Sequence, residues 1–244
     1  MKSCITLFVA ALLGVILTAT CALAQPASWL SVNDEASKKL TAQVAAALSQ
    51  ALWDENTDAR QAAMFALEAM DAGAAPAIPT IAERLRDVDA YLRADSSRIL
   101  TKLDAPAVPS VIAALYDPDP RVRELAARTF IEMKTTPTSA IPALTQLLWD
   151  CVPDVRQAAI EALEAMGPAA KPAIDALVQR LRDPDAYIRG DASRTLVELG
   201  PETLPSMLPL LRDGDPRVRQ LTARTIEEIE FNLTSGNYID YTKQ

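Results

Sequence analysis

Histidine is absent from the whole chain of 244 residues. Without it there is no imidazole general base, no histidine-assisted serine or cysteine nucleophile, and no zinc site of the common kinds. A glycine-rich phosphate-binding loop is absent from the sequence as well. These absences predict a protein with no catalytic residues, no metal and no cofactor, and they favour binding over catalysis.

Glycine and aromatic residues are scarce, at 7 residues and 5% of the chain, whereas 50% of the residues are hydrophobic. Alanine and leucine recur throughout, and both residues favour helices. A β-sandwich would need more β-branched and aromatic residues. The composition therefore predicts an all-α fold of close-packed helices.

The first residues of the chain differ from the rest. Residues 1–24 begin with a basic residue, continue as an uncharged apolar run over 5–19 and end on small residues, which is the pattern of a cleaved signal peptide. We therefore expect an exported protein, periplasmic or extracellular after cleavage. The run is shorter than the roughly 20 residues that span a bilayer, so we expect no membrane span in the mature chain. A retained anchor and a lipoprotein attached at Cys21 are the alternatives.

Cleavage of this segment would change both the cysteine content and the charge. It removes Cys4 and Cys21, which leaves Cys151 alone and permits no internal disulfide. It also removes Lys2 from the 24 basic side chains, which leaves 23 against 32 acidic ones and a net charge of −9. Such a charge disfavours nucleic acid and anionic membranes as partners. A protein or peptide is the expected partner.

An internal repeat is the strongest feature of the sequence. An Asp-rich turn, an Arg and a helix with Ala and Leu at fixed offsets recur six times, and the spacings between successive Arg residues are 33, 30, 33, 33 and 30. The first three Arg residues precede the last three by 96 residues each, which indicates a duplicated block of three repeats. We call them the ladder Arg residues: Arg60, Arg93, Arg123, Arg156, Arg189 and Arg219.

The repeat sets the expected domain boundaries. After the signal peptide we expect an N-terminal capping region, a solenoid made of two blocks, and a tail that loses the repeat pattern. Part of the capping region, 36–53, reads as a half-repeat because Leu52-Trp53-Asp54 matches Leu148-Trp149-Asp150. The predicted boundaries are 25–53 for the cap, 54–231 for the solenoid with blocks 54–149 and 150–231, and 232–244 for the tail.

Each unit contains two helical patterns. In the fourth unit Val155, Ala159 and Leu163 mark one apolar stripe, and a second stripe begins at Ile174. Glycine and proline between the stripes stop one helix and start the other. Two helices of about 12 residues cannot bury both apolar faces alone, so neighbouring units must stack on one another.

Paired helices with an Asp-containing turn and an aliphatic-Arg-x-x-Ala-x-x-Ala-Leu second helix, as in Val155-Arg156-Gln-Ala-Ala-Ile-Glu-Ala-Leu163, resemble HEAT repeats. The similarity is to the short type found in phycobilisome-lyase-like proteins and covers roughly 54–231. Ala59 departs from the pattern, because it stands where an aliphatic residue is usual. The resemblance implies a right-handed α-solenoid of about six helix pairs, with the Arg-bearing helices lining the concave side.

The resemblance also implies that the ladder Arg residues bond to turn carboxylates and fix neighbouring units, rather than bind a ligand. Asp-x-Asp sequences occur in four of the turns, at 87–89, 117–119, 183–185 and 213–215. A calcium loop needs six or more oxygen ligands at set spacings, and none of the four turns continues in that way. We expect these carboxylates to cap helices instead.

Five residues beyond each ladder Arg, the side chain should point out of the stack, because Ala and Leu take the core positions of that helix. In the competing interpretation the surface is merely solvated, and Asp95 and Asp191 each neutralise an Arg three residues later. Apart from Glu161 in the fourth unit, these positions are the predicted partner contacts: Phe65, Arg98, Arg128, Arg194 and Arg224.

The sequence therefore predicts an exported, non-enzymatic scaffold that holds a partner protein or peptide on the concave face. The alternative is a lyase-like or oxidoreductase-like accessory enzyme of the phycobilisome-lyase-like HEAT family. That alternative depends on likeness in the repeat and not on any catalytic residue.

Overall fold

The computed structural model of the protein describes residues 34–235. The expected signal peptide and most of the expected tail lie outside the described residues. The chain divides into two compact units between Gln43 and Val44, a point within helix α2 (Asp34–Ala51). All of the repeats lie in the second unit.

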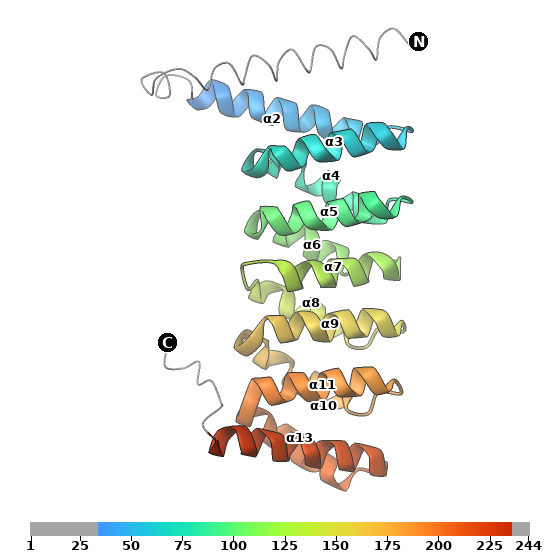
Figure 1. The fold of residues 1–244 in the computed structure, drawn as a ribbon, viewed down its shortest axis with the longest axis vertical. Coiled ribbons are helices and arrows are strands. Elements are labelled where there is room, and N and C mark those ends of the chain that lie inside the picture. The colour runs from blue at the N-terminus through green and yellow to red at the C-terminus, as the bar shows by residue number, and fades with distance from the viewer. Residues whose placement is uncertain (1–33, 236–244) are drawn as a thin grey trace. The chain divides into compact units, whose positions relative to one another are not determined.

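The Arg-bearing helices of the second unit form one layer, in which each helix packs against the next in chain order (Figure 1). Each begins directly after a turn and carries its ladder Arg in the first turn of the helix. The sixth runs to Thr234, past the predicted end of the repeats at 231. This Arg layer comprises α3 (Thr57–Ala69), α5 (Ala90–Leu103), α7 (Pro120–Glu132), α9 (Pro153–Ala165), α11 (Ala186–Leu199) and α13 (Pro216–Thr234).

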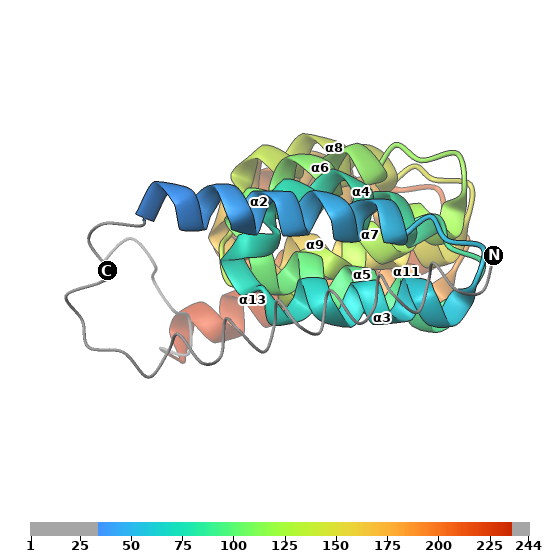
Figure 2. The same cartoon turned by 90° about the horizontal axis from the view of Figure 1, so that it is seen from above.

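The partner helices form a second layer behind the first, as Figure 2 shows from above. Helices of about 12 residues were predicted here, and that length is wrong, because these α-helices have only four to seven residues. This short-helix layer comprises α4 (Ile78–Glu83), α6 (Val108–Ala114), α8 (Ile141–Leu147), α10 (Ile174–Arg180) and α12 (Leu204–Met207).

Proline marks the start of four of the five short helices. Pro79, Pro109, Pro142 and Pro205 each stand in the first turn of a short helix, where a missing N–H costs nothing. The residues before and after form 3₁₀ turns in place of a longer α-helix. These turns are η2 (Asp71–Ala77), η3 (Arg84–Arg86), η4 (Ala105–Ala107), η5 (Thr138–Ala140), η6 (Gly167–Ala173), η7 (Gly200–Thr203) and η8 (Leu208–Arg212).

The core lies between the two layers and between successive units. The predicted stripe of the fourth unit is fully buried, since Val155, Ala159 and Leu163 are all 0% exposed. A Leu stands two residues before the first Asp of each turn. In five successive turns this Leu is 0% exposed: Leu52, Leu85, Leu115, Leu148 and Leu181.

The turn carboxylates cap the helices. Asp119 accepts a hydrogen bond from the main-chain N–H of Arg121 at 2.9 Å, and Asp89, Asp185 and Asp215 act in the same way. The first Asp of each turn accepts the N–H of the second, as Asp117 does from Asp119 at 2.9 Å. The capping role predicted for the Asp-x-Asp sequences is therefore confirmed for the second Asp of each, whereas the first Asp pairs with an Arg side chain.

Candidate binding surfaces

The ladder Arg residues hold the turns that precede their own helices. In each unit, Nη1 of the Arg donates to the main-chain carbonyl of the Asp six residues earlier. The distance is 2.9 Å from Arg60 to Asp54 and 2.7 Å from Arg219 to Asp213, with the other four in between or equal. Each Arg therefore fixes the entry of the chain into its own helix.

Three ladder Arg residues also bond to the turn carboxylate of the next unit. Arg156 donates from Nε and Nη2 to the two oxygens of Asp183 at 2.9 and 3.0 Å, and both side chains are buried. Arg123 bonds Asp150 in the same bidentate way at 2.7 and 2.9 Å. Arg60 reaches Asp87 at 3.2–3.3 Å. These are the charge-assisted links between units that the resemblance implied.

The two shorter units use a different link. Within the described residues, Arg93 and Arg189 bond only to carbonyls of their own turns. The carboxylate they would reach, Asp117 or Asp213, instead accepts from Arg86 or Arg182 in the preceding turn. The interval to the next ladder Arg is 30 residues in these two units rather than 33, so the next Asp is displaced relative to the ladder Arg.

A Trp–Arg stack occurs once in each block. The guanidinium of Arg84 lies 3.6 Å from the ring centre of Trp53, and that of Arg180 lies 3.8 Å from Trp149. Both Arg residues also pair with a turn carboxylate that bonds a ladder Arg. Arg84 pairs with Asp87 at 3.5 Å, and Arg180 pairs with Asp183 at 3.2 Å. Burial lowers the pKa of the Arg84 guanidinium despite the opposing effect of Asp87. The 96-residue repeat places both the Trp and the Arg of each stack at equivalent positions, but the sequence alone does not show that the two side chains touch.

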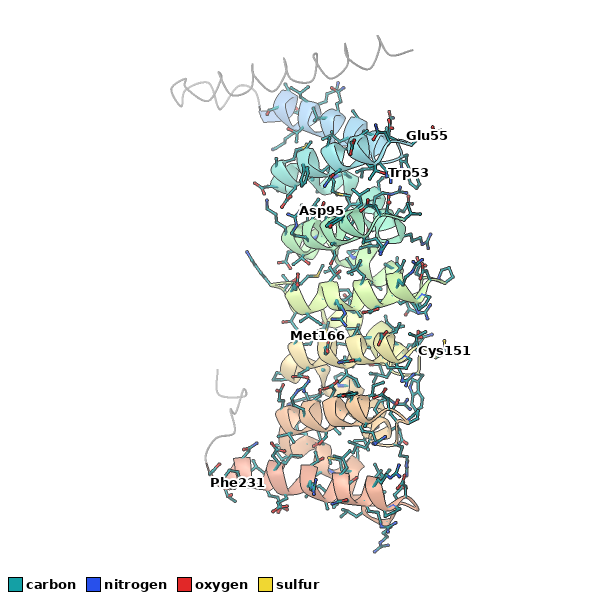
Figure 3. All side chains as sticks on the ribbon, turned by 45° about the vertical axis from the view of Figure 1, so that its right-hand side comes forward. Trp53, Glu55, Asp95, Cys151, Met166 and Phe231 are labelled. Atoms are coloured by element: carbon teal, nitrogen blue, oxygen red, sulfur yellow. The ribbon has the colours of Figure 1, made fainter. Side chains whose placement is uncertain are left out.

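The two indoles remain open to solvent. They lie on the edge of the solenoid that carries the Asp-containing turns, which we call the turn edge. Trp53 and Trp149 are 57% and 58% exposed, and Figure 3 shows Trp53 and Glu55 projecting from the same edge as Cys151. A hollow of about 530 Å³ lies beside Trp53, and Glu83, Arg84 and Asp87 help to line it. This edge therefore combines a flat apolar surface with charged groups.

The hollow beside Trp53 is lined by equal numbers of cationic and anionic side chains. The three guanidinium groups that line it, of Arg60, Arg84 and Arg86, all pair with carboxylates. The carboxylates of Asp54 and Glu83 also line it, and Glu83 acts electrostatically on Arg84. A ligand would therefore meet charges of both signs beside an exposed indole.

The predicted partner contacts lie on the Arg layer and are exposed. Phe65 is 51% exposed, but most of the Arg residues in this row are ion-paired. Arg98 pairs with Asp95 at 2.6 Å and also with Glu68 of the preceding unit. Arg194 follows the same scheme with Asp191 at 3.0 Å and Glu164 at 2.9 Å. Its hydrogen bond to Glu164 raises the pKa of Arg194.

Arg128 and Arg224 were expected to lack an acidic neighbour three residues earlier. Arg128 pairs instead with Glu124, four residues earlier, at 3.0 Å, and lies 4.0 Å from Glu161. Arg224 has no ion-pair partner among the described residues. The positive charge of the predicted contacts is therefore largely neutralised by acidic side chains of the same chain. Phe65 and Arg224 are the two predicted contacts that form no ion pair among the described residues.

The described residues contain no group of three or more Cys, Asp or Glu side chains placed to hold a metal ion. Cys151 is a free, exposed thiol on the turn edge. Within residues 34–235, no helix has the length and apolar character needed to cross a bilayer.

Comparison with known proteins bears on the repeats. HEAT repeats match residues 78–164 and 174–234, and the PBS lyase HEAT-like repeat matches residues 155–183. A search of curated proteins finds no match.

Among solved structures, the complex of CpcE and CpcF of phycocyanin lyase from Nostoc sp. PCC7120 is 25% identical, with a TM-score of 0.47, and the match covers 73% of this chain and 74% of that one. A designed armadillo repeat protein in complex with the peptide (KR)4 is 15% identical, with a TM-score of 0.49 and coverage of 75% and 98%. Human deoxyhypusine hydroxylase is 17% identical, with a TM-score of 0.42 and coverage of 80% and 98%.

The family match extends over more than half of the chain and coincides with the stacked helix pairs. The protein is an all-helical solenoid, and it belongs to the HEAT-repeat family.

Proposed function

We propose that the protein is an exported, non-enzymatic scaffold that holds an extended segment of a partner protein along its solenoid. The observation that carries this proposal is the pair of exposed indoles, Trp53 and Trp149, each fixed by a stacked guanidinium. Tryptophan is enriched among residues that dominate binding energy, and a rigid side chain loses little entropy when it binds.

The spacing of the two indoles sets the length of the partner segment. Trp53 and Trp149 occupy equivalent positions three units apart. Packed helices lie about 8–10 Å apart, so three steps correspond to about 24–30 Å. An extended chain rises about 3.3 Å per residue, so about seven to nine residues would bridge the two contacts. The partner would therefore present two bulky side chains at that separation.

The net charge of the chain favours a basic partner. The whole chain carries a net charge of −8, and the carboxylates of Asp54 and Glu83 line the hollow beside Trp53. An ammonium or guanidinium group that lies against the free part of the indole would gain a cation–π contact as well as these carboxylates. A Lys or Arg next to one of the two bulky side chains fits this surface.

A binding assay shows whether the partner contacts the turn edge or the predicted contacts on the Arg layer. The mature chain, immobilised, captures its partner from the compartment to which it is exported. The double variant Trp53→Ala, Trp149→Ala should weaken that complex at least tenfold. As a matched control we choose Phe231→Ala, because this exposed aromatic lies at the opposite end of the stack from Trp53 (Figure 3).

The same assay measures the contribution of the predicted row. A variant with Ala at Arg98, Arg128, Arg194 and Arg224 tests its charges, and Phe65→Ala tests its apolar contact. If these changes release the partner while the Trp variant binds normally, the contact lies on the Arg layer and not on the turn edge. Turnover of a substrate by the purified protein alone, abolished by one point change, would overturn the non-enzymatic assignment.

Export is tested separately. Residues 1–30 fused to a reporter enzyme that is active only outside the cytoplasm should give activity. The same fusion without residues 1–24 should give none. Activity that does not depend on these residues would contradict the proposed signal peptide.

A further inference from the structure

The stack ends in side chains that occupy core positions of the repeat but are not covered. Leu211 is equivalent to the five Leu residues that close the earlier units at 0% exposure, yet it is 38% exposed. Leu208 is 55% exposed, although its equivalent one unit earlier, Val178, is 1% exposed. The final unit therefore exposes two side chains whose equivalents in the preceding unit are buried.

Helix α13 shows the same change. Four residues after the ladder Arg, Met64, Ala127 and Ile160 are fully buried, whereas the equivalent Ala223 is exposed. Seven residues after it, five units place a side chain that is no more than 2% exposed: Leu67, Leu100, Phe130, Leu163 and Leu196. The sixth, Ile226, is only partly covered. The surface made of Leu208, Leu211, Arg219, Ala223, Ile226 and Glu230 is the end face.

The charges of the end face are unpaired. Arg219 bonds the carbonyls of Asp213 and Gly214, as a ladder Arg does, and acts electrostatically on the Asp213 carboxylate, but among the described residues it forms no ion pair with a carboxylate of another unit. Arg60, Arg123 and Arg156 find that partner in the next unit. Glu230 also has no cationic partner in the described part of the chain. One unpaired cation and one unpaired anion therefore flank the apolar centre.

These residues share one side of α13. Arg219, Ala223, Ile226 and Glu230 follow one another at spacings of four, three and four, which places them on a single helix face. The midpoint between Arg219 and Glu230 is also the midpoint between Ala223 and Ile226. When two such helices pair antiparallel about that point, Arg219 of each copy faces Glu230 of the other, and Ala223 of each faces Ile226.

We propose that the end face binds the end face of a second copy of this chain, with a two-fold axis through the middle of α13. Such an interface is self-complementary, as a two-fold dimer requires, because the cation and the anion lie at equal distances on either side of the axis. Leu208 and Leu211 of both copies would supply the kind of apolar contact that the following unit supplies elsewhere in the stack. The proposal is independent of the binding function assigned to the turn edge.

Charge reversal tests the interface directly. Sedimentation of the mature chain should show a concentration-dependent dimer. Glu230→Arg places two Arg residues in opposition at both ends of the interface and should weaken the dimer at least 100-fold. Arg121→Glu is the control, because Arg121 is an exposed Arg of α7 away from the end face, and it should leave the dimer unchanged.

Mixing restores the complementary pairs. Arg219→Glu alone should also be monomeric, and an equimolar mixture of Arg219→Glu and Glu230→Arg chains should form a heterodimer, because each Glu then meets an Arg. The mixture needs no variant with both changes, and circular dichroism of each variant checks its fold. A wild-type chain that stays monomeric at all concentrations, or a dimer that tolerates Glu230→Arg, overturns the proposal. A monomer that dimerises only after removal of residues 236–244 would show that the chain covers its own end face, and it overturns the proposal as well.

Discussion

Arg156 and Asp183 form a bidentate ion pair between two units of the solenoid, with bonds of 2.9 and 3.0 Å. Arg180 adds a third bond to the same carboxylate at 3.2 Å and stacks its guanidinium on Trp149. The equivalent side chains 96 residues earlier, Arg60, Asp87, Arg84 and Trp53, repeat the arrangement. One buried carboxylate thus links the turn, the next unit and the exposed indole.

Removal of Arg156 should be costly. Arg156→Ala removes two bonds to a buried carboxylate and one to a main-chain carbonyl, so we expect a loss of about 3 kcal/mol of unfolding free energy. Arg189→Ala removes bonds only to carbonyls of its own turn and should cost about 1 kcal/mol. Urea denaturation of the two variants measures the difference. Equal losses would show that the inter-unit pair adds no stability.

Much of the fold could be predicted because it depends on local patterns that recur. The spacing of the ladder Arg residues gave the number of units, and the apolar stripe around Ala159 gave the buried face. The length of the short helices was not predicted correctly. Proline permits a helix to start at residues such as Pro79 and Pro142 without deciding where it ends, and the 3₁₀ turns that follow depend on packing.

The ion pairs of the surface were harder to predict, because they join helices of different units. Asp95 and Arg98 lie on one helix, so their pairing follows from spacing alone. Glu164 and Arg194 are 30 residues apart, and their pairing requires the register between two helices. Asp213 pairs with Arg182 and not with Arg189, because this unit is three residues shorter than the one before it. The shorter spacing is visible in the sequence, but the change of ion-pair partner is not.

Acid should weaken the link between Arg123 and Asp150. Burial on its own would raise the pKa of Asp150, but hydrogen bonds from Arg123 and the N–H of Val152 outweigh it, so the pKa lies below its ordinary value. A carboxylate with a lowered folded-state pKa adds stability above its unfolded pKa of about 3.9, and that stability is lost as the pH falls through the folded-state value.

The variant Asp150→Asn should therefore be less stable than the wild type at pH 7, and the difference should shrink below about pH 4. Urea denaturation between pH 7 and pH 3 measures this. Glu132→Gln, at an exposed position, should change stability at pH 7 by less than about 0.5 kcal/mol. A difference for Asp150→Asn that stays constant down to pH 3 would contradict the assignment.

Two glycines should respond in opposite directions to alanine. Gly190 lies inside α11, and Gly190→Ala should stabilise the protein by about 0.5–1 kcal/mol through helix propensity. Gly167 has a φ of +54°, where a side chain is strained, so Gly167→Ala should cost about 1 kcal/mol. An added Cβ meets no atom within 4 Å at either site, so the pair isolates the backbone effect. Melting temperatures that shift in the same direction would refute it.

A buried hydroxyl pair connects α5 and α7. The Oγ of Ser97 lies 2.8 Å from Oγ1 of Thr129, and Thr129 donates its own proton to the carbonyl of Leu125 at 2.7 Å, so Ser97 is the donor of the pair. Ser193 and Thr225, 96 residues later, repeat the contact at 2.7 Å. Each pair places two hydroxyl groups between successive Arg-bearing helices, and the Ser97 hydroxyl depends on Thr129 as its acceptor.

The asymmetry between losing one partner and losing both provides the test. Thr129→Val keeps the shape of the side chain but leaves the Ser97 hydroxyl without an acceptor, so we expect a loss of about 1–3 kcal/mol. Ser97→Ala combined with Thr129→Val removes both polar groups, and its stability should lie within about 1 kcal/mol of the wild type. The double-mutant cycle, measured by urea denaturation, should therefore give a coupling energy of about 1 kcal/mol or more. Additive losses would show that the two hydroxyls act independently and that the bond does not stabilise the contact between the units.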